Sequence, residues 1–239
     1  MLKRTHAFFA AAVLVGLIPA AGLALGPYSQ DFEGLTQSDP GALAGDGWLV
    51  FGNVFDPGGG YLYGYGPFPA PNDGAAFCQI AIGEGGAEQG AQQLVVFSDY
   101  LNGDHGNGNI IESNVFQEQI IGTGDVGETW IFDFQAKLGN IEGGSTALAF
   151  IKTLDPGAGY ATTNFITADM TSIPTTWSNF TLSIVIDATL DGQILQIGFL
   201  NTATLYEGSG IFYDNINFYA DEPTPVEEKT WGDVKSLYR

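Results

Sequence analysis

The stretch ETWIFDFQAK, residues 128–137, alternates apolar and polar side chains along its whole length. Successive side chains of a β-strand point to opposite faces, so this stretch would have one apolar and one polar face. The apolar face would carry Trp130, Phe132, Phe134 and Ala136, and the polar face Asp133, Gln135 and Lys137. The pattern predicts a half-buried antiparallel strand.

Comparable stretches recur along the chain. Residues 180–187, FTLSIVID, alternate in the same way, and Gly, Asn, Asp and Pro fill the intervals as turns require. The body has no helical periodicity of useful length and no internal repeat. We therefore expect an all-β fold, a two-sheet antiparallel β-sandwich of the jelly-roll type, in a single domain with a short C-terminal tail. Strands are expected near residues 29–34, 48–55, 75–82, 93–98, 110–121, 128–138, 145–154, 161–169, 176–187, 193–201 and 209–220.

The N-terminal segment differs from the body. Residues 1–24 combine a short basic start with an apolar run that ends in small residues, which is typical of a signal peptide. An uncleaved membrane anchor is the alternative, although the run is short for a span and contains Pro19. We expect cleavage after Ala24, no transmembrane segment in the mature chain, and a domain of residues 25–220 that is secreted or held at the cell surface.

The C-terminal segment also differs from the body. Residues 221–239 begin with an acidic linker that contains two prolines and end in a short amphipathic stretch. Trp231, Val234 and Leu237 would share one face of a short helix. We expect this tail to be separable from the domain and to act in envelope attachment or sorting, with a frayed end as the alternative.

The body is strongly acidic. The formal net charge of the chain is −20, and Lys137 and Lys152 are the only basic residues between Leu25 and Ala220. Such a surface repels nucleic acid and anionic lipid, so neither is an expected partner. It suits divalent cations or a high-salt medium, and simple solubility of an exported protein is the plainer alternative.

Few residues point to catalysis. The only histidine after the N-terminal segment, His105, lies in a loop rich in Gly and Asn, and no HExxH or Gly-x-Ser-x-Gly motif is present. Cys78, the only cysteine, sits in a strand-like run and is predicted to be a buried, unreactive thiol. We expect a non-catalytic protein. A glycoside hydrolase or lyase is the less favoured alternative, because a glycosidase needs only two carboxylates and acidic residues are abundant in this chain.

Short motifs occur along the body in a defined order. They are DFEG at 31–34, GW at 47–48, PNDGAA at 71–76, NVFQEQI at 114–120, GETWIF at 127–132, WSNFTL at 177–182, LQIGF at 195–199 and YDN at 213–215. In this order they resemble bacterial jelly-roll carbohydrate-binding modules of the galactose-binding-like type, from about Ser29 to Tyr219. The resemblance implies a secreted domain whose partner is a polysaccharide or a cell-surface glycan.

The last expected strand carries an acid on its apolar face. By alternation, Asp214 shares that face with Phe212, Ile216 and Phe218. A carboxylate there needs a partner, and no Lys or Arg lies nearby in sequence. The resembling modules often hold a structural calcium between their first and last strands, which implies Ca²⁺ bound by Asp214 with Asp31 or Glu33. A solvated Glu33, with Asp214 capping a bulge or a turn, is the alternative.

The stretch GGGYLYGYGPFP, residues 58–69, spaces tyrosines with glycine. Tyrosines in a loop can lie flat on a sugar ring and donate a hydrogen bond, or the loop can fold back as a lid that buries the same rings. The expected ligand-binding residues are Tyr61, Tyr63, Tyr65 and Trp48. The competing function is a surface-layer, matrix or self-assembling structural protein that binds no sugar, and the glycan and the oligomeric state stay open.

Overall fold

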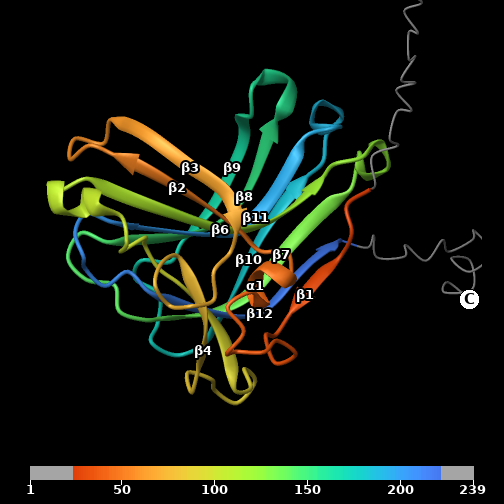
Figure 1. The fold of residues 1–239 in the computed structure, drawn as a ribbon. Helices are drawn as coiled ribbons and strands as arrows, with labels where there is room; N and C mark the ends of the chain where they lie inside the picture. The colour runs from red at the N-terminus through yellow and green to blue at the C-terminus, as the bar shows by residue number, and fades with distance from the viewer. Residues whose placement is uncertain (1–23, 222–239) are drawn as a thin grey trace, which may run out of the picture.

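The computed structural model describes residues 24–221 and shows a two-layer β-sandwich (Figure 1). Sheet A has the strand order β10-β7-β12-β5-β4, with β1 paired to β12, and sheet B has the order β3-β2-β6-β11-β8-β9. All strand pairs are antiparallel. The predicted all-β jelly-roll sandwich is therefore confirmed. The predicted signal peptide and C-terminal tail lie outside the described residues and stay predictions.

The elements have the following bounds. Sheet A contains β1 (Tyr28–Gln30), β4 (Cys78–Ile82), β5 (Gln92–Val96), β7 (Thr129–Leu138), β10 (Ser178–Val185) and β12 (Ile211–Ala220). Sheet B contains β2 (Leu49–Phe55), β3 (Tyr61–Pro69), β6 (Ile110–Ile120), β8 (Thr146–Asp155), β9 (Ala161–Asp169) and β11 (Ile194–Ala203). Short helices are α1 (Ala42–Gly45), η1 (Gly103–Asn107), η2 (Thr123–Asp125), η3 (Pro156–Ala158) and η4 (Ala188–Leu190). Within residues 24–221, no helix has the length and hydropathy needed to cross a bilayer.

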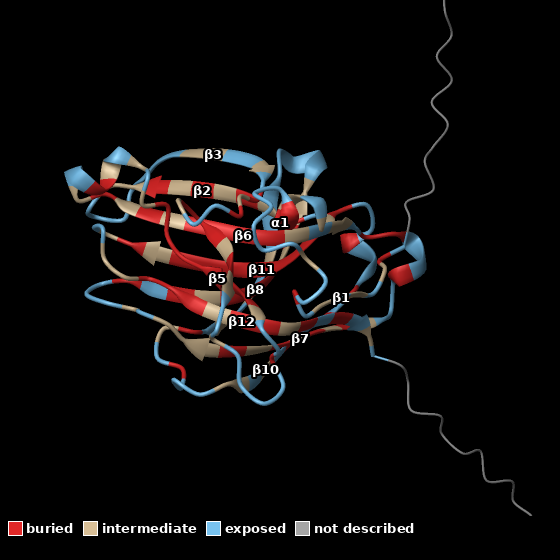
Figure 2. Cartoon of the chain, turned by 60° about the horizontal axis from the view of Figure 1, so that its bottom comes forward, coloured by how far each residue is buried: buried red, intermediate tan, exposed pale blue. Residues whose placement is uncertain are grey.

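The core lies between the sheets and is rich in aromatic rings. The predicted inward face of β7, Trp130 to Ala136, is buried as expected. Phe199 of β11 stacks on Tyr213 of β12 with parallel ring planes, and its centroid lies 6.3 Å from that of Trp48. Figure 2 shows buried residues running along β11 and β6 at the centre of the sandwich, whereas the edge strand β3 is largely exposed. The rings thus hold the two sheets together across the central strands.

The alternation of β12 changes phase in the middle of the strand. Its register against β7 shifts between Asp214 and Asn217, and Asn215 adopts a positive φ of 47°. Such a bulge inserts an extra residue and reverses which side chains face inward. Ile216 and Phe218 are buried as predicted, but Phe212 points outward and Tyr213 is buried, so the prediction for the first half of the strand is wrong. The bulge therefore presents Phe212 on the outer face of sheet A.

Candidate functional site

A groove of about 810 Å³ crosses the outer face of sheet A. A second hollow of about 540 Å³ lies beside it, and Glu84 lines both. The larger groove is lined by residues that include Gln79, Val95, Phe97, Tyr100, Asn140 and Phe212, and the second by residues that include Gln89, Gln135, Lys137, Trp177 and Asn179. Volumes of this size match those of ligand-binding clefts.

Strand pairing aligns the floor of the groove. Phe212 of β12 pairs with Lys137 of β7 on one side and with Val95 of β5 on the other, and Val95 pairs with Gln79 of β4. Directly opposed side chains on one face of a sheet lie about 5 Å apart. The four residues therefore form a continuous row across the strands. Trp177, just before β10, extends the row because Ser178 pairs with Ala136.

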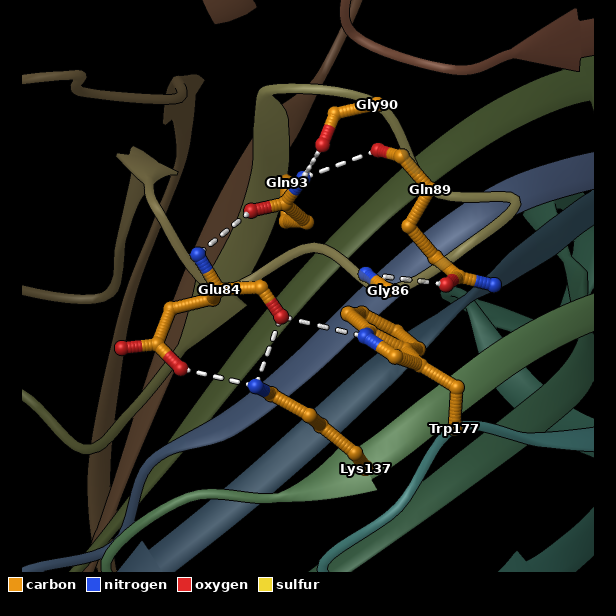
Figure 3. A network of polar contacts seen from close by, with 7 residues as sticks. All are labelled: Glu84, Gly86, Gln89, Gly90, Gln93, Lys137 and Trp177. Carbon is orange, nitrogen blue, oxygen red and sulfur yellow. Dashed lines mark hydrogen bonds and ion pairs between the residues drawn. The ribbon is translucent and has the colours of Figure 1, made fainter.

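The β4–β5 loop forms one wall and is fixed by hydrogen bonds (Figure 3). The Lys137 ammonium donates to the Glu84 carbonyl at 2.6 Å and to Glu84 Oε2 at 2.7 Å. Trp177 Nε1 donates to the same carbonyl at 3.0 Å, and the Glu84 N–H donates to Gln93 Oε1 at 3.2 Å. Gln93 Nε2 in turn donates to the Gln89 carbonyl at 2.8 Å. The network couples the loop to the indole ring, so the ring is held in a defined position.

Lys137 lies between two aromatic rings. Its Nζ is 5.6 Å from the centroid of Trp177 and 5.2 Å from that of Phe212. Cation–π attraction of this kind adds to the ion pair with Glu84. An ammonium has three protons, and the hydrogen bonds within residues 24–221 use two of them, both to Glu84. The second hollow therefore holds a charge-balanced pair with one donor left for a ligand.

Amide side chains surround the second hollow. Gln135 Oε1 accepts from Gln89 Nε2 at 2.5 Å and from Asn215 Nδ2 at 2.7 Å, and Gln135 Nε2 donates to Asn179 Oδ1 at 3.0 Å. Amides both donate and accept, which suits ligands with many hydroxyl groups. The site thus combines aromatic rings with neutral hydrogen-bonding groups.

The tyrosines singled out from the sequence lie elsewhere. Residues 61–69 form the edge strand β3 of sheet B, so the expectation of a loop is wrong. The ring of Tyr65 packs against Gly52, where the Cβ of any larger residue would lie only 2.2 Å from the ring. Tyr61 and Tyr63 are 61% and 44% exposed. The Tyr63 and Tyr65 hydroxyls donate to Asp104 Oδ2 at 2.6 Å and to Asp99 Oδ2 at 2.5 Å.

These hydrogen bonds affect the phenols. The bond to Asp104 raises the pKa of Tyr63, and burial with the bond to Asp99 raises the pKa of Tyr65. The rings form an aromatic surface, but their hydroxyls are committed to carboxylates. Trp48, the fourth predicted ligand-binding residue, is completely buried in the core with its Nε1 bonded to Asp46, so it offers no face to a surface ligand.

The expected calcium ligands lie near the junction of β1 and β12. Asp214 is fully buried, its Oδ1 accepts from the Asn215 N–H at 2.6 Å, and its Oδ2 has no hydrogen-bond partner within residues 24–221. Burial, with the negative charges of Asp31 and Glu33 nearby, raises the pKa of Asp214 to about 7. Asp31 and Glu33 are thus close enough to act on Asp214 electrostatically, while a bound ion stays a prediction.

Asp31 and Glu33 are not on a strand as predicted. β1 ends at Gln30 because Phe32 takes a positive φ of 61° and buries its ring in the core. Glu33 Oε1 accepts from the Ala91 and Gln92 N–H groups at 2.7 and 2.6 Å, whereas Asp31 lines a polar cavity of about 290 Å³ beside Asn215. Within residues 24–221, no three His, Cys, Asp or Glu side chains converge on one metal position. A cation there would use the orphaned oxygen of Asp214 together with backbone oxygens.

The residues weighed for catalysis are buried. His105 lies in η1, its Nε2 is 3.0 Å from the Asp99 carbonyl oxygen, and burial lowers its pKa. Cys78 is completely buried, as predicted, and burial raises the pKa of its thiol, which disfavours the reactive thiolate.

No protein-family model matches the chain, and no curated protein is significantly similar to it in sequence. Among solved structures, it is similar to the enzymatically active domain of tailspike protein 4 from bacteriophage CBA120, with 13% identity, a TM-score of 0.45 and 78% of this chain covered. It spans 22% of that tailspike chain.

Other similar structures are small domains. The CBM22-1 xylan-binding domain of Xyn10C from Paenibacillus barcinonensis matches 85% of this chain and 98% of its own length, with 12% identity and a TM-score of 0.43. The module TmCBM61, solved in complex with β-1,4-galactotriose, matches 78% of this chain and 99% of its own, with 13% identity and a TM-score of 0.40. Carbohydrate-binding modules, the family that the sequence resembles, are thus among the solved structures similar to this chain.

Proposed function

We propose that this chain is a secreted, non-catalytic domain that binds an extended, uncharged polysaccharide in the groove of sheet A. The observation that carries the proposal is the row of Trp177, Lys137, Phe212 and Gln79 across the strands, bordered by amide side chains. Aromatic rings stack on the apolar faces of sugar rings, and amides exchange hydrogen bonds with their hydroxyls.

The shape of the site favours a chain of sugars over a single sugar. The two hollows share Glu84 and follow one another across the sheet. Each alone has the volume of a site for a small molecule. An oligosaccharide that spans both would contact Phe212 in one and Trp177 in the other.

Charge argues for a neutral glycan. The chain carries a formal charge of −20, and the ammonium of Lys137, which lines the second hollow, is paired with Glu84. A polyanion would meet long-range repulsion without a free cation to offset it. We therefore expect neutral glycans to bind and uronate-rich polymers to be excluded at low salt.

Calcium belongs to the proposal as a structural ion. The orphaned Oδ2 of Asp214 is a buried acceptor, and a divalent cation would stabilise its ionised form. The ion would link the β12 bulge to the turn after β1, close to Asp31 and Glu33. It would organise the sandwich without contacting the sugar.

Affinity electrophoresis tests the function. The protein is run in gels that contain neutral xylan, β-glucan or galactan, or the polyanions alginate and pectate. Trp177→Ala and Phe212→Ala should each lose retardation by a neutral glycan. Tyr219→Ala is the matched control, because Tyr219 is an exposed aromatic on the same sheet that lines neither hollow.

Two outcomes would contradict the groove. Retardation that survives both groove substitutions but is lost in Tyr61→Ala or Tyr63→Ala would move the site to the aromatic surface of β3. Absence of retardation by every glycan, together with self-association on sizing, would favour the structural protein.

A further inference from the structure

Within residues 24–221, five strands of the sandwich have a partner on one side only, and they are not protected equally. Strands β4 and β10 end sheet A, β3 and β9 end sheet B, and the three-residue β1 pairs only with β12. An edge strand presents unpaired N–H and C=O groups, so it can pair with another chain unless the protein blocks it. The way each edge is blocked therefore indicates where a partner could add.

Two of the edges are blocked. Strand β3 contains Pro67 and Pro69, and its register against β2 shifts twice. In β4, the outward N–H of Ile80 donates to Asn72 Oδ1 at 2.6 Å, and its carbonyl accepts from Gln37 Nε2 at 3.4 Å. Prolines, bulges and covering loops are the usual means of closing a sheet edge.

Strand β10 has none of these features. Its sequence SNFTLSIV contains no proline and no charged residue, and its pairing with β7 runs without a register shift. The Ile186 N–H donates to the Glu128 carbonyl, so the even-numbered residues face β7. The N–H and C=O groups that point away from the sheet belong to Asn179, Thr181, Ser183 and Val185. Within residues 24–221, no hydrogen bond reaches these groups.

We propose that β10 pairs antiparallel with β10 of a second copy of this chain. Centring the pair on Leu182 places the outward backbone groups of both copies opposite one another, with Thr181 facing Ser183 of the second copy. The same register sets Asn179 opposite Val185 on the outer face, and Phe180 opposite Ile184 on the inner face. Every side chain then meets a neutral neighbour on its own face of the sheet.

The edge itself indicates a second copy as the occupant, because its eight uncharged residues pair with themselves about Leu182 without setting one charge against another. A chain with a formal charge of −20 repels its own copies over most of its surface, so this uncharged edge is where two copies can approach. The neighbouring edge β9 fits less well, because it ends in Asp169 and has a register shift against β8. Screening should help the pairing, since the Debye length falls to about 3 Å at 1 M salt.

The pairing has a geometric consequence for the groove. Ser178 and Asn179 of β10 border the second hollow. In the proposed register the outer faces of both copies lie on the same side of one continuous sheet. Two grooves would then face the same way, which would raise the avidity for a polymer that reaches both.

Sedimentation of the secreted chain tests the proposal. The chain should be a dimer at high protein concentration in 1 M NaCl and dissociate as the salt is lowered. Thr181→Pro should give a monomer with an intact fold, because it removes an outward N–H without touching the β7 ladder. Thr167→Pro is the matched control on β9 and should remain dimeric. A monomeric wild-type chain at high salt, or a dimeric Thr181→Pro chain that is folded by circular dichroism, would overturn the proposal.

Cysteine trapping tests the register and does not depend on the proline variant. The double variant Thr181→Cys/Ser183→Cys should form a covalent dimer on mild oxidation, because hydrogen-bonded antiparallel pairs have Cα atoms about 5.5 Å apart, within disulfide reach. The double variant Asn179→Cys/Ser183→Cys has the same number of thiols, but in the proposed register neither cysteine faces a cysteine of the second copy. It should therefore stay monomeric on a non-reducing gel. Cys78 is buried and should not contribute. Equal trapping of the two double variants would refute the register.

Discussion

The two outer faces of the sandwich use aromatic residues in different ways. On sheet B, Phe116, Phe150 and Leu200 pack with Leu49, Phe51 and Leu148 into a second cluster and are no more than 5% exposed. On sheet A, Phe212 and Trp177 stay partly exposed, separated by Lys137 and bordered by amides. Apolar rings that contact one another stabilise the fold, whereas rings spaced by polar groups remain available to a ligand.

The two lysines of the body sharpen this contrast, since each lies on one outer face. Lys137 is paired with Glu84 beside the groove. Lys152 lies 4.9 Å above the Phe150 ring and 3.5 Å from Asn114 Oδ1, and burial lowers its pKa. The first lysine organises a site, whereas the second covers a hydrophobic cluster with its aliphatic stem.

Removing a ring from each face should give the largest effect and separate the two roles. Phe150→Ala should lower the free energy of unfolding by about 3–5 kcal/mol, because the side chain is completely buried. Phe212→Ala should cost much less stability while weakening sugar binding. Urea unfolding and affinity electrophoresis of both variants check this. Similar stability losses in the two variants would break the distinction between the faces.

Calcium should stabilise the fold through Asp214. If the ion binds only the native state, free calcium at 100 times its Kd adds roughly 2.7 kcal/mol. EDTA should therefore lower the melting temperature, and calcium should restore it. The response should disappear in Asp214→Asn, whereas Asp133→Asn, a carboxylate elsewhere on the outer face of sheet A, should keep it. An identical melting curve in EDTA and calcium would remove the ion from the proposal.

The pH dependence of the metal-free protein gives an independent check on Asp214. Its native pKa of about 7 lies above the ordinary value of 3.8, so the native state holds a proton that the unfolded state releases. Its contribution to stability is therefore most favourable near pH 4 and is lost as the pH rises toward 7. In EDTA, the melting temperature of the wild type relative to Asp214→Asn should fall across this range. A flat difference would mean that the carboxyl is not buried in solution.

The lysines should respond differently to the same substitution. Lys137→Met should free the β4–β5 loop from Trp177 and weaken glycan binding several-fold, with a stability change of about 1 kcal/mol or less, because the pair with Glu84 is partly exposed. Lys152→Met should leave glycan binding unchanged and should not destabilise the fold, since it removes a desolvated charge. Gel retardation and thermal melts of the two variants measure both effects. Equal losses of binding would show that the two outer faces are coupled.

The smallest effect is expected at the edge of sheet B. Tyr63→Phe removes a hydroxyl that donates to Asp104 at an exposed position and should change stability by about 0.5 kcal/mol or less. Binding to neutral glycans should be unaffected if the groove is the site. A clear loss of retardation would bring the β3 tyrosines back as ligand-binding residues.

Sequence alternation was sufficient where a strand is regular. It predicts the buried face of β7 because that strand pairs without a shift against β10. It fails in β12, where a bulge at Asn215 reverses the phase, and in β1, where Phe32 turns the chain. Both residues have positive φ without being glycine; Asn is enriched in this conformation but Phe is not, so residue type gives a signal only for the bulge in β12.

The groove could not be predicted because it depends on pairing between distant segments. Lys137, Trp177 and Phe212 are far apart in sequence and meet only through the register of β5, β7, β10 and β12. The sequence did carry one signal of the site: Lys137 is a rare basic residue in an acidic chain and lies on the polar face of its strand. The resemblance also linked the two ends of the body, which β1 and β12 do bring together, whereas calcium binding by Asp31, Glu33 and Asp214 stays a prediction.

The pairing of β1 with β12 also decides how the domain can be tethered. Tyr28 lies opposite Phe218, and the Asp221 N–H is bonded to Thr129, so both ends of the body leave from one end of the sandwich. Phe212, in the groove, lies eight residues before Ala220, the last residue of β12, and is roughly 25 Å from it at the usual rise of a strand. A neighbouring domain or an anchor joined to either end of the body would therefore attach at the same end of the sandwich. The groove would lie toward the opposite end, away from the attachment.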